Sequence, residues 1–129
     1  MSSVQMRLVR ELPVVTCWAS HNGKTVQLEA LVDTGSAGTM LKTDVADALG
    51  ISHTNATGVY TVVGVGGREP VYTHWLDRFI ISDHAATDVL AEISGMEYGL
   101  PIDAIIGADV LQSIGAIIRM GPLLIEFEE

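Results

Sequence analysis

Thirteen glycines divide this chain of 129 residues into short segments of about the length of a β-strand. Several of these segments are rich in β-branched and apolar residues, which are typical of strands. The dipeptide Asn22-Gly23 favours a tight hairpin turn, and it separates two such runs at 12–20 and 25–32. We therefore predict a mainly β fold that includes a hairpin over these two runs.

The rest of the chain predicts further strands and two or three short helices. A second hairpin is predicted from the β-prone runs 59–63 and 68–73, which flank a glycine-rich tip at 64–67. Other strands are predicted at 75–82, 102–106, 116–120 and 123–127. Helices are predicted at 43–49, capped by Thr43 and stopped by Gly50, and at 108–114, stopped by Gly115. The segment 84–101 is less regular, and its portion 88–94 is predicted to be helical.

Composition and charge exclude several classes of protein. With 48% hydrophobic and 18% charged residues, the chain can fill a core, and its length suits a single domain over residues 1–129. Seven Lys and Arg against sixteen Asp and Glu give a net charge of −9. Such a surface repels phosphates and anionic headgroups, so we expect no nucleic-acid partner and no membrane partner. The first residues lack the apolar core of a signal peptide, which predicts a cytoplasmic protein.

The cysteine and the histidines predict no metal site and no cofactor. Cys17 is the only cysteine, so neither an internal disulfide nor a cysteine-based zinc cage can form. It lies in a predicted strand, where a small buried hydrophobe is the expected role. The four histidines, His21, His53, His74 and His84, show no metal-ligand spacing.

Two segments carry the chemistry. The first is Ala-Leu-Val-Asp-Thr-Gly-Ser at 30–36, which places Asp33 just after a predicted strand. The second is Ala-Ile-Ile-Gly-Ala-Asp-Val-Leu at 104–111. In this order, with the glycine-rich hairpin between them, they resemble the two signature segments of the retropepsin-like aspartic proteases. The resemblance covers most of the chain and implies a closed-barrel-like retropepsin fold with a flap hairpin.

The resemblance implies an aspartic endopeptidase that acts as a homodimer on an extended peptide or protein substrate. Hydrolysis at an aspartic dyad needs two carboxylates that share one proton. The sequence has one Asp-Thr-Gly triplet, so the second carboxylate has to come from an identical subunit. Asp33 of each subunit is then the catalytic residue, and the two meet at a two-fold axis. The alternative is a catalytically inactive dimeric module of the same fold that binds extended peptides.

The resemblance also gives supporting roles to the residues that follow Asp33. Thr34 reaches across the two-fold axis to hydrogen-bond the opposite loop. Gly35 lets backbone and substrate approach the carboxylate. Ser36 donates a hydrogen bond to the outer carboxylate oxygen.

The second segment and the glycine-rich hairpin have roles by the same resemblance. Ile105, Ile106 and Gly107 pack beneath the active-site loop, and Gly107 permits a close crossing of the chain. The flap that closes over the substrate comprises Val62, Val63, Gly64, Val65, Gly66 and Gly67. We expect an apolar pocket for the substrate, lined by Val32, Val63, Val65 and Leu111.

The sequence departs from the retroviral pattern at two positions. Retroviral members commonly carry an acidic residue two places after Asp-Thr-Gly and an arginine after the apolar-apolar-Gly motif, and the two side chains pair. Here Ala37 and Ala108 stand at these positions, so neither charge is left unpaired. The segment 84–101 is longer than the usual link and is interpreted as an added helix near the cleft or interface. The run 123–127 fits a strand of a dimer sheet and a core strand equally well.

Overall fold

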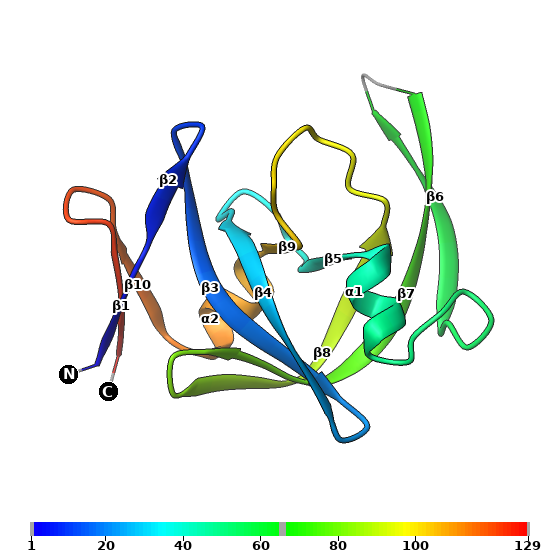
Figure 1. Cartoon of the computed structure of the whole chain (residues 1–129), viewed down its shortest axis with the longest axis horizontal. Coiled ribbons are helices and arrows are strands. Elements are labelled where there is room, and N and C mark those ends of the chain that lie inside the picture. Colours follow the sequence, from blue (N-terminus) through cyan, green and yellow to red (C-terminus); the bar gives the residue numbers. More distant parts are fainter. Residues whose placement is uncertain (1, 65–66, 129) are drawn as a thin grey trace.

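The computed structural model describes residues 2–64 and 67–128, without the side chains of residues 62–69. The described strands form two sheets (Figure 1). A three-stranded sheet has the order β1-β11-β10, and an eight-stranded sheet has the order β2-β3-β4-β9-β5-β8-β7-β6. Because β3 also pairs with β7, the larger sheet curls into a nearly closed ring. The fold is therefore mainly β with a nearly closed sheet, as the sequence predicts.

The first predicted hairpin is confirmed. Strand β3 (Leu12–His21) pairs antiparallel with β4 (Lys24–Val32) along their lengths. The turn residues Asn22 and Gly23 have φ values of 54° and 81°, as a two-residue turn with left-handed backbone requires. Residues of β3 alternate between the core and the outside, and Cys17 is fully buried. This hairpin ends directly at the Asp-Thr-Gly triplet.

The second predicted hairpin is also present. Strand β6 (Gly58–Gly64) pairs antiparallel with β7 (Gly67–Ile81), and the register runs from Gly58 opposite Thr73 to Gly64 opposite Gly67. The hairpin projects from one end of the molecule (Figure 1). Strand β7 has 15 residues and includes both runs that the sequence predicts as separate strands. Val65 and Gly66 lie outside the described residues.

The prediction of a helix at 88–94, and with it of an added helix within 84–101, is wrong. Residues His84–Ser94 form strand β8, which pairs with β7. Val89, Ala91 and Ile93 are all buried, and a two-residue period suits a strand. Leucine, alanine and glutamate favour a helix locally, but pairing with the long edge of β7 overrides this preference.

Two short helices adjoin the strands around the Asp-Thr-Gly triplet. Strand β5 (Met40–Lys42) leads into α1 (Thr43–Ala48), and β9 (Ala104–Ile106) leads through Gly107 into α2 (Ala108–Ser113). The predicted cap is wrong by one residue, because Lys42 is the N-cap and Thr43 is the first residue of α1. The predicted stops hold, since Gly50 and Gly115 have φ values of 79° and 64°.

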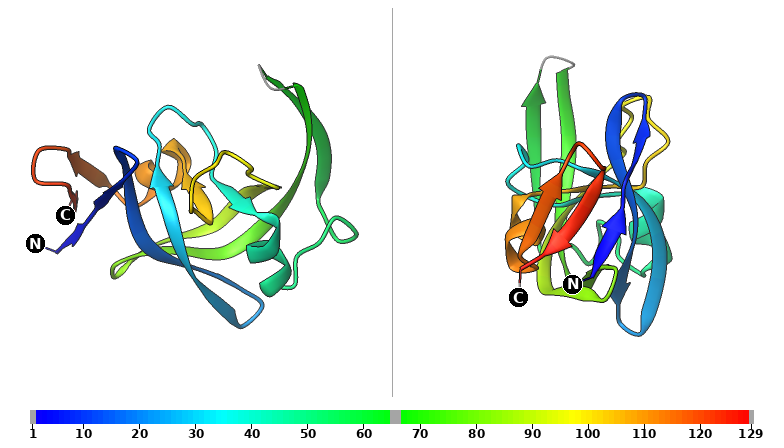
Figure 2. Two further views of the ribbon diagram at one scale, coloured as in Figure 1. Left: turned by 45° about the horizontal axis from the view of Figure 1, so that its top comes forward. Right: turned by 90° about the vertical axis from the view of Figure 1, so that its left-hand side faces the viewer.

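The chain ends contribute to the smaller sheet. Strand β11 (Leu124–Phe127) lies between β1 (Ser3–Gln5) and β10 (Ala116–Arg119), and both neighbours belong to the same chain. The right-hand view of Figure 2 shows these strands side by side. Ile125 and Phe127 are buried in the main core. The run 123–127 therefore serves as a core strand within the chain. Strand β2 (Arg7–Val9) pairs with β3 at the edge of the larger sheet.

The main core lies inside the curled sheet and is closed by the two helices. Val32 at the end of β4 and Ile106 at the end of β9 are buried in this core and are register partners in a parallel pair. The site described below lies where these two strands end. Among the described residues, no helix is both long enough and apolar enough to cross a bilayer.

Candidate active site

Asp33 is the first residue after β4, and its own loop holds its carboxylate. The backbone N–H of Gly35 donates to Oδ1 of Asp33 at 3.0 Å. The backbone N–H of Asp33 donates to the carbonyl of Ile106 at 3.0 Å, which continues the pairing of β4 with β9 by one residue. The side chain is half-buried. The loop therefore presents a carboxylate of fixed orientation at the end of two paired strands.

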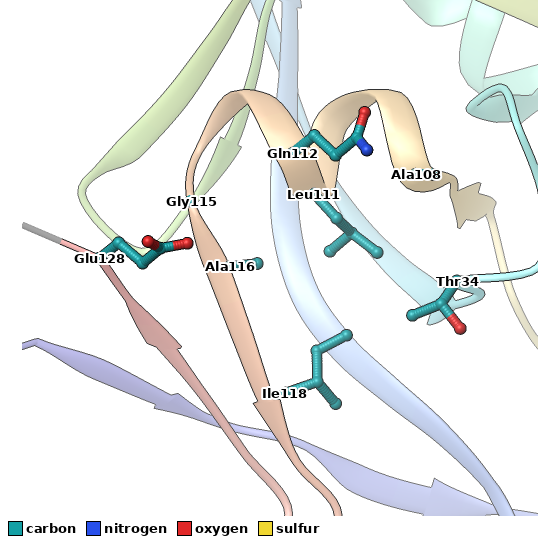
Figure 3. Close-up of a pocket in the computed structure, with 8 residues that line it drawn as sticks. All are labelled: Thr34, Ala108, Leu111, Gln112, Gly115, Ala116, Ile118 and Glu128. Atoms are coloured by element: carbon teal, nitrogen blue, oxygen red, sulfur yellow. The ribbon is translucent and has the colours of Figure 1, made fainter.

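Thr34 and Gly35 are exposed beside this carboxylate. A β-carbon added to Gly35 would lie 3.3 Å from Oδ1 of Asp33, so glycine keeps the carboxylate open to approach. Thr34 lines a surface pocket of about 540 Å³ together with residues of α2, β10 and Glu128 (Figure 3). The lining residues are Thr34, Ala108, Leu111, Gln112, Gly115, Ala116, Ile118 and Glu128.

Gly107 lies directly beneath the loop that carries Asp33. A β-carbon at this position would lie 2.3 Å from the carbonyl oxygen of Gly38 and 2.9 Å from that of Ser36. Real β-carbons essentially never come within 3.0 Å of such atoms. The backbone N–H of Ala108 donates to the Ser36 carbonyl at 2.7 Å in the same crossing. Only glycine allows the two segments to pass this closely.

Thr39 and Asp109 join the loop to α2, and the sequence analysis missed this pair as functional residues. The hydroxyl of Thr39, which is fully buried, donates to Oδ1 of Asp109 at 2.8 Å. The same hydroxyl accepts the backbone N–H of Gly107 at 3.1 Å, and the N–H of Thr39 donates to Oδ2 of Asp109 at 3.3 Å. The sequence signal for this pair is Asp109, a charged residue within an otherwise apolar motif. These hydrogen bonds link the two segments that cross at Gly107. Ala37 and Ala108 belong to the same two segments and carry no charge.

Ser36 has a different contact from the one expected. Its hydroxyl donates to the carbonyl of Gly38 at 2.8 Å. A hydroxyl has one proton to donate, so the expected donation to the carboxylate of Asp33 is not made in this structure. Ser36 instead stabilises the turn of the active-site loop.

The apolar residues beside Asp33 also differ from those expected. Val32 and Leu111 are buried in the core with 7% and 6% of their surface exposed, and the exposed part of Leu111 lines the pocket beside Thr34. Side chains alternate along a strand, so Leu31 and not Val32 shares a face with Asp33. Leu31 is the register partner of Ile105, which in turn pairs with Met40, and all three are half-buried. The side chain of Val63, and Val65 altogether, lie outside the described part of the chain.

Ile105 and Ile106 thus have separate environments. Ile106 is fully buried and packs in the core beneath the loop, whereas Ile105 lies on the face that it shares with Leu31 and Met40. The sequence analysis treats them alike because both are isoleucines in a strand. Their alternation decides which one borders the carboxylate.

The remaining reactive side chains lie apart from this loop. Cys17 is fully buried in β3, and burial, followed by the charges of Glu29 and Asp103, raises the pKa of its thiol. Among the described residues, no three or more His, Cys, Asp or Glu side chains gather closely enough to hold a metal ion.

The chain matches the family model described as "Aspartyl protease" over residues 18–110. Among solved structures, it is similar to a retropepsin-like aspartic protease from Rickettsia conorii, with a TM-score of 0.71 and 16% sequence identity. That match covers 96% of this chain and 95% of the other. No curated protein sequence matches significantly. Both signature segments lie within the matched range, apart from Leu111 at the end of the second. The chain therefore belongs to this aspartyl protease family, and its fold is retropepsin-like.

Proposed function

We propose that the protein is an aspartic endopeptidase whose active site forms when two copies bring their Asp33 carboxylates together. The observation that carries this proposal is the fixed carboxylate at the exposed loop, oriented by the Gly35 N–H at 3.0 Å. One such carboxylate per chain supplies half of a dyad, since the general base and the general acid are separate groups. Family membership supports the same chemistry.

The proposed reaction needs no covalent intermediate. One ionised carboxylate takes a proton from a water molecule, and the water oxygen attacks the carbonyl carbon of the scissile peptide bond. The second carboxyl group, which is protonated, donates a hydrogen bond and then its proton to the carbonyl oxygen. The gem-diol then collapses: the first carboxyl group gives the amide nitrogen the proton that it took from water, the second carboxylate takes a proton from a gem-diol hydroxyl, and the C–N bond breaks. The dyad thus returns to a state with one shared proton.

The surface beside the dyad supports association of two copies. Thr34 and Gly35 are exposed on the loop, and Thr34 borders the pocket of about 540 Å³ against α2 and β10. In the dimer, we place the partner's loop at this surface. Both edges of β11 are already occupied by β1 and β10 of its own chain. Any strand of the partner that joins this sheet would therefore pair with β1 or β10, which are its edge strands.

The test uses Asp33→Asn, with Asp83→Asn as the control because Asp83 is exposed in a turn. Cleavage of a peptide library should be lost in Asp33→Asn and kept in the control. In mixtures of wild type and Asp33→Asn, the activity should fall as the square of the wild-type fraction, because only dimers with two carboxylates are active. A linear fall would contradict the shared dyad. Persistent cleavage by pure Asp33→Asn would refute the catalytic assignment. Peptide binding by the wild type without any cleavage would support the inactive module.

A further inference from the structure

A row of register partners leads from the active-site loop to an acidic side chain. Leu31 on β4 pairs with Ile105 on β9, Ile105 pairs with Met40 on β5, and Met40 pairs with Glu92 on β8. Side chains of register partners lie on the same face of a sheet, and Leu31 precedes Asp33 by two residues. The face beside Asp33 is therefore apolar over three strands and becomes acidic at the fourth.

Glu92 lies against the loop that carries Asp33. A β-carbon added to Gly38 would be 3.2 Å from Oε1 of Glu92, so the carboxylate rests on the glycine backbone. The backbone N–H of Glu92 also donates to the carbonyl of Thr39 at 2.9 Å. The position of the carboxylate is thus tied to the active-site loop through both side chain and backbone.

Tyr60 reaches the same carboxylate from the flap hairpin. It lies on β6 with 41% of its surface exposed, and its hydroxyl interacts with Glu92. Burial, then the hydrogen bond to Glu92 and its negative charge, raise the pKa of Tyr60 to about 12. The phenol therefore keeps its proton at neutral pH and remains a donor to the carboxylate. Glu92 lies between the active-site loop and the flap strand.

Glu92 is an acid without a basic partner in the described part of the chain. The ion pairs among described side chains are Arg7 with Glu29, His21 with Asp77, His84 with Asp83, and Arg119 with Glu126. A half-buried carboxylate, already held by one neutral donor, binds an ammonium or guanidinium group better than a neutral side chain.

The distance from the scissile bond follows from strand geometry. Neighbouring strands lie about 4.8 Å apart, so three steps from β4 to β8 span about 14 Å. An extended peptide rises about 3.3 Å per residue, and this span corresponds to about four residues. A lysine or arginine side chain itself covers part of this distance, so fewer peptide residues are needed between the scissile bond and Glu92.

We propose that Glu92 forms a subsite for a lysine or arginine of the substrate, within about four residues of the scissile bond. The proposal rests on the proposed peptidase function and names its substrate class: extended peptides with apolar residues at the cleaved bond and a basic residue near it. The net charge of −9 attracts such peptides as well.

The test compares peptides that are identical except for lysine or glutamine at each position near the cleaved bond. For the wild type, kcat/KM should be about fivefold to tenfold higher with lysine at one position. Glu92→Gln should abolish this preference, and Glu92→Lys should reverse it toward a peptide with glutamate there. The control Asp88→Asn removes one charge from the exposed side of the same strand and should keep the preference. Far-ultraviolet circular dichroism checks that each variant is folded.

A second readout separates this proposal from the peptidase function. The same peptides are titrated against the Asp33→Asn protein and against Asp33→Asn combined with Glu92→Gln. Tighter binding of the lysine peptide, lost in the double variant, supports the subsite even where no cleavage occurs. Cleavage or binding with no difference between lysine and glutamine at any position would overturn the subsite while leaving the peptidase function intact. A preference that survives in Glu92→Gln and disappears in Asp88→Asn would also overturn it.

Discussion

Replacing Gly107 by alanine tests how the active-site loop is held. The new β-carbon would lie 2.3 Å from the carbonyl oxygen of Gly38, 2.5 Å from its carbonyl carbon and 2.9 Å from the carbonyl oxygen of Ser36. All three atoms belong to the backbone, so no side-chain rotation relieves the contact. The loop and the segment beneath it must separate by roughly 1 Å to restore ordinary contacts.

The loss of stability in Gly107→Ala follows from this separation. Overpacking of a tight interior contact costs about 1–3 kcal/mol. The same movement strains two hydrogen bonds across the crossing, Gly107 N–H to Thr39 Oγ1 at 3.1 Å and Ala108 N–H to Ser36 O at 2.7 Å. A buried group left unpaired costs about 1–3 kcal/mol. We therefore expect Gly107→Ala to lower the free energy of unfolding by about 3 kcal/mol or more, with a fall in Tm of roughly 10 °C.

The measurement is urea unfolding of wild type, Gly107→Ala and the control Gly121→Ala. Nothing lies within 4 Å of a β-carbon added at Gly121, which is exposed, so the control should unfold close to wild type. Gly107→Ala should also lose peptidase activity, because Asp33 lies on the displaced loop. A variant at Gly107 that is as stable as the control would refute the close crossing as the reason for glycine.

Three other expectations are separately measurable. Thr39→Val keeps the side-chain volume and leaves the Gly107 N–H and an Asp109 oxygen unpaired, so urea unfolding should show a loss of about 1–3 kcal/mol that Thr39→Ser largely avoids. The Cys17 thiol should resist a thiol reagent until the protein unfolds, because burial excludes the reagent and raises the pKa; full labelling of the native protein would contradict this. The phenolate absorbance of Tyr60 should titrate near pH 12, and earlier in Glu92→Gln. Since folding raises this pKa, its contribution to stability is complete below about pH 10 and is lost as the pH rises toward 12.

The sequence predicts those parts of the fold that local chemistry determines. The turn at Asn22-Gly23 and the stops at Gly50 and Gly115 each depend on a left-handed backbone that the residue type favours. Strand β8 is different, because its local composition favours a helix, yet the turn at Ser82 and Asp83 folds it back as a hairpin partner of the adjacent strand β7. Short strands such as β5 have the same difficulty, since three residues carry too little pattern to be recognised.

Some residues of the candidate site can likewise be predicted from the sequence, and others cannot. The Asp-Thr-Gly triplet and Gly107 are visible in the sequence because their spacing and order resemble a known family. Thr39 is not visible, since the sequence predicts no element around it and its role arises from Asp109, 70 positions away. The sequence predicts Val32 as a pocket residue, but Leu31 shares the face of Asp33, because the pairing of β4 with β9 continues through Asp33.

The Thr39 and Asp109 network gives the loop a support that works before two subunits meet. Where retroviral relatives pair an acid with an arginine, this chain has Ala37 and Ala108, and a buried hydroxyl joins the loop to α2 instead. The network spans the crossing at Gly107, so loop, strand end and helix hold one another within a single chain. A dyad assembled from two copies benefits from this arrangement, since each carboxylate is already oriented and association need not order the loop. Disrupting the network should therefore weaken the proposed dimer and its activity together, whereas Glu92→Gln should change the relative rates for lysine and glutamine peptides.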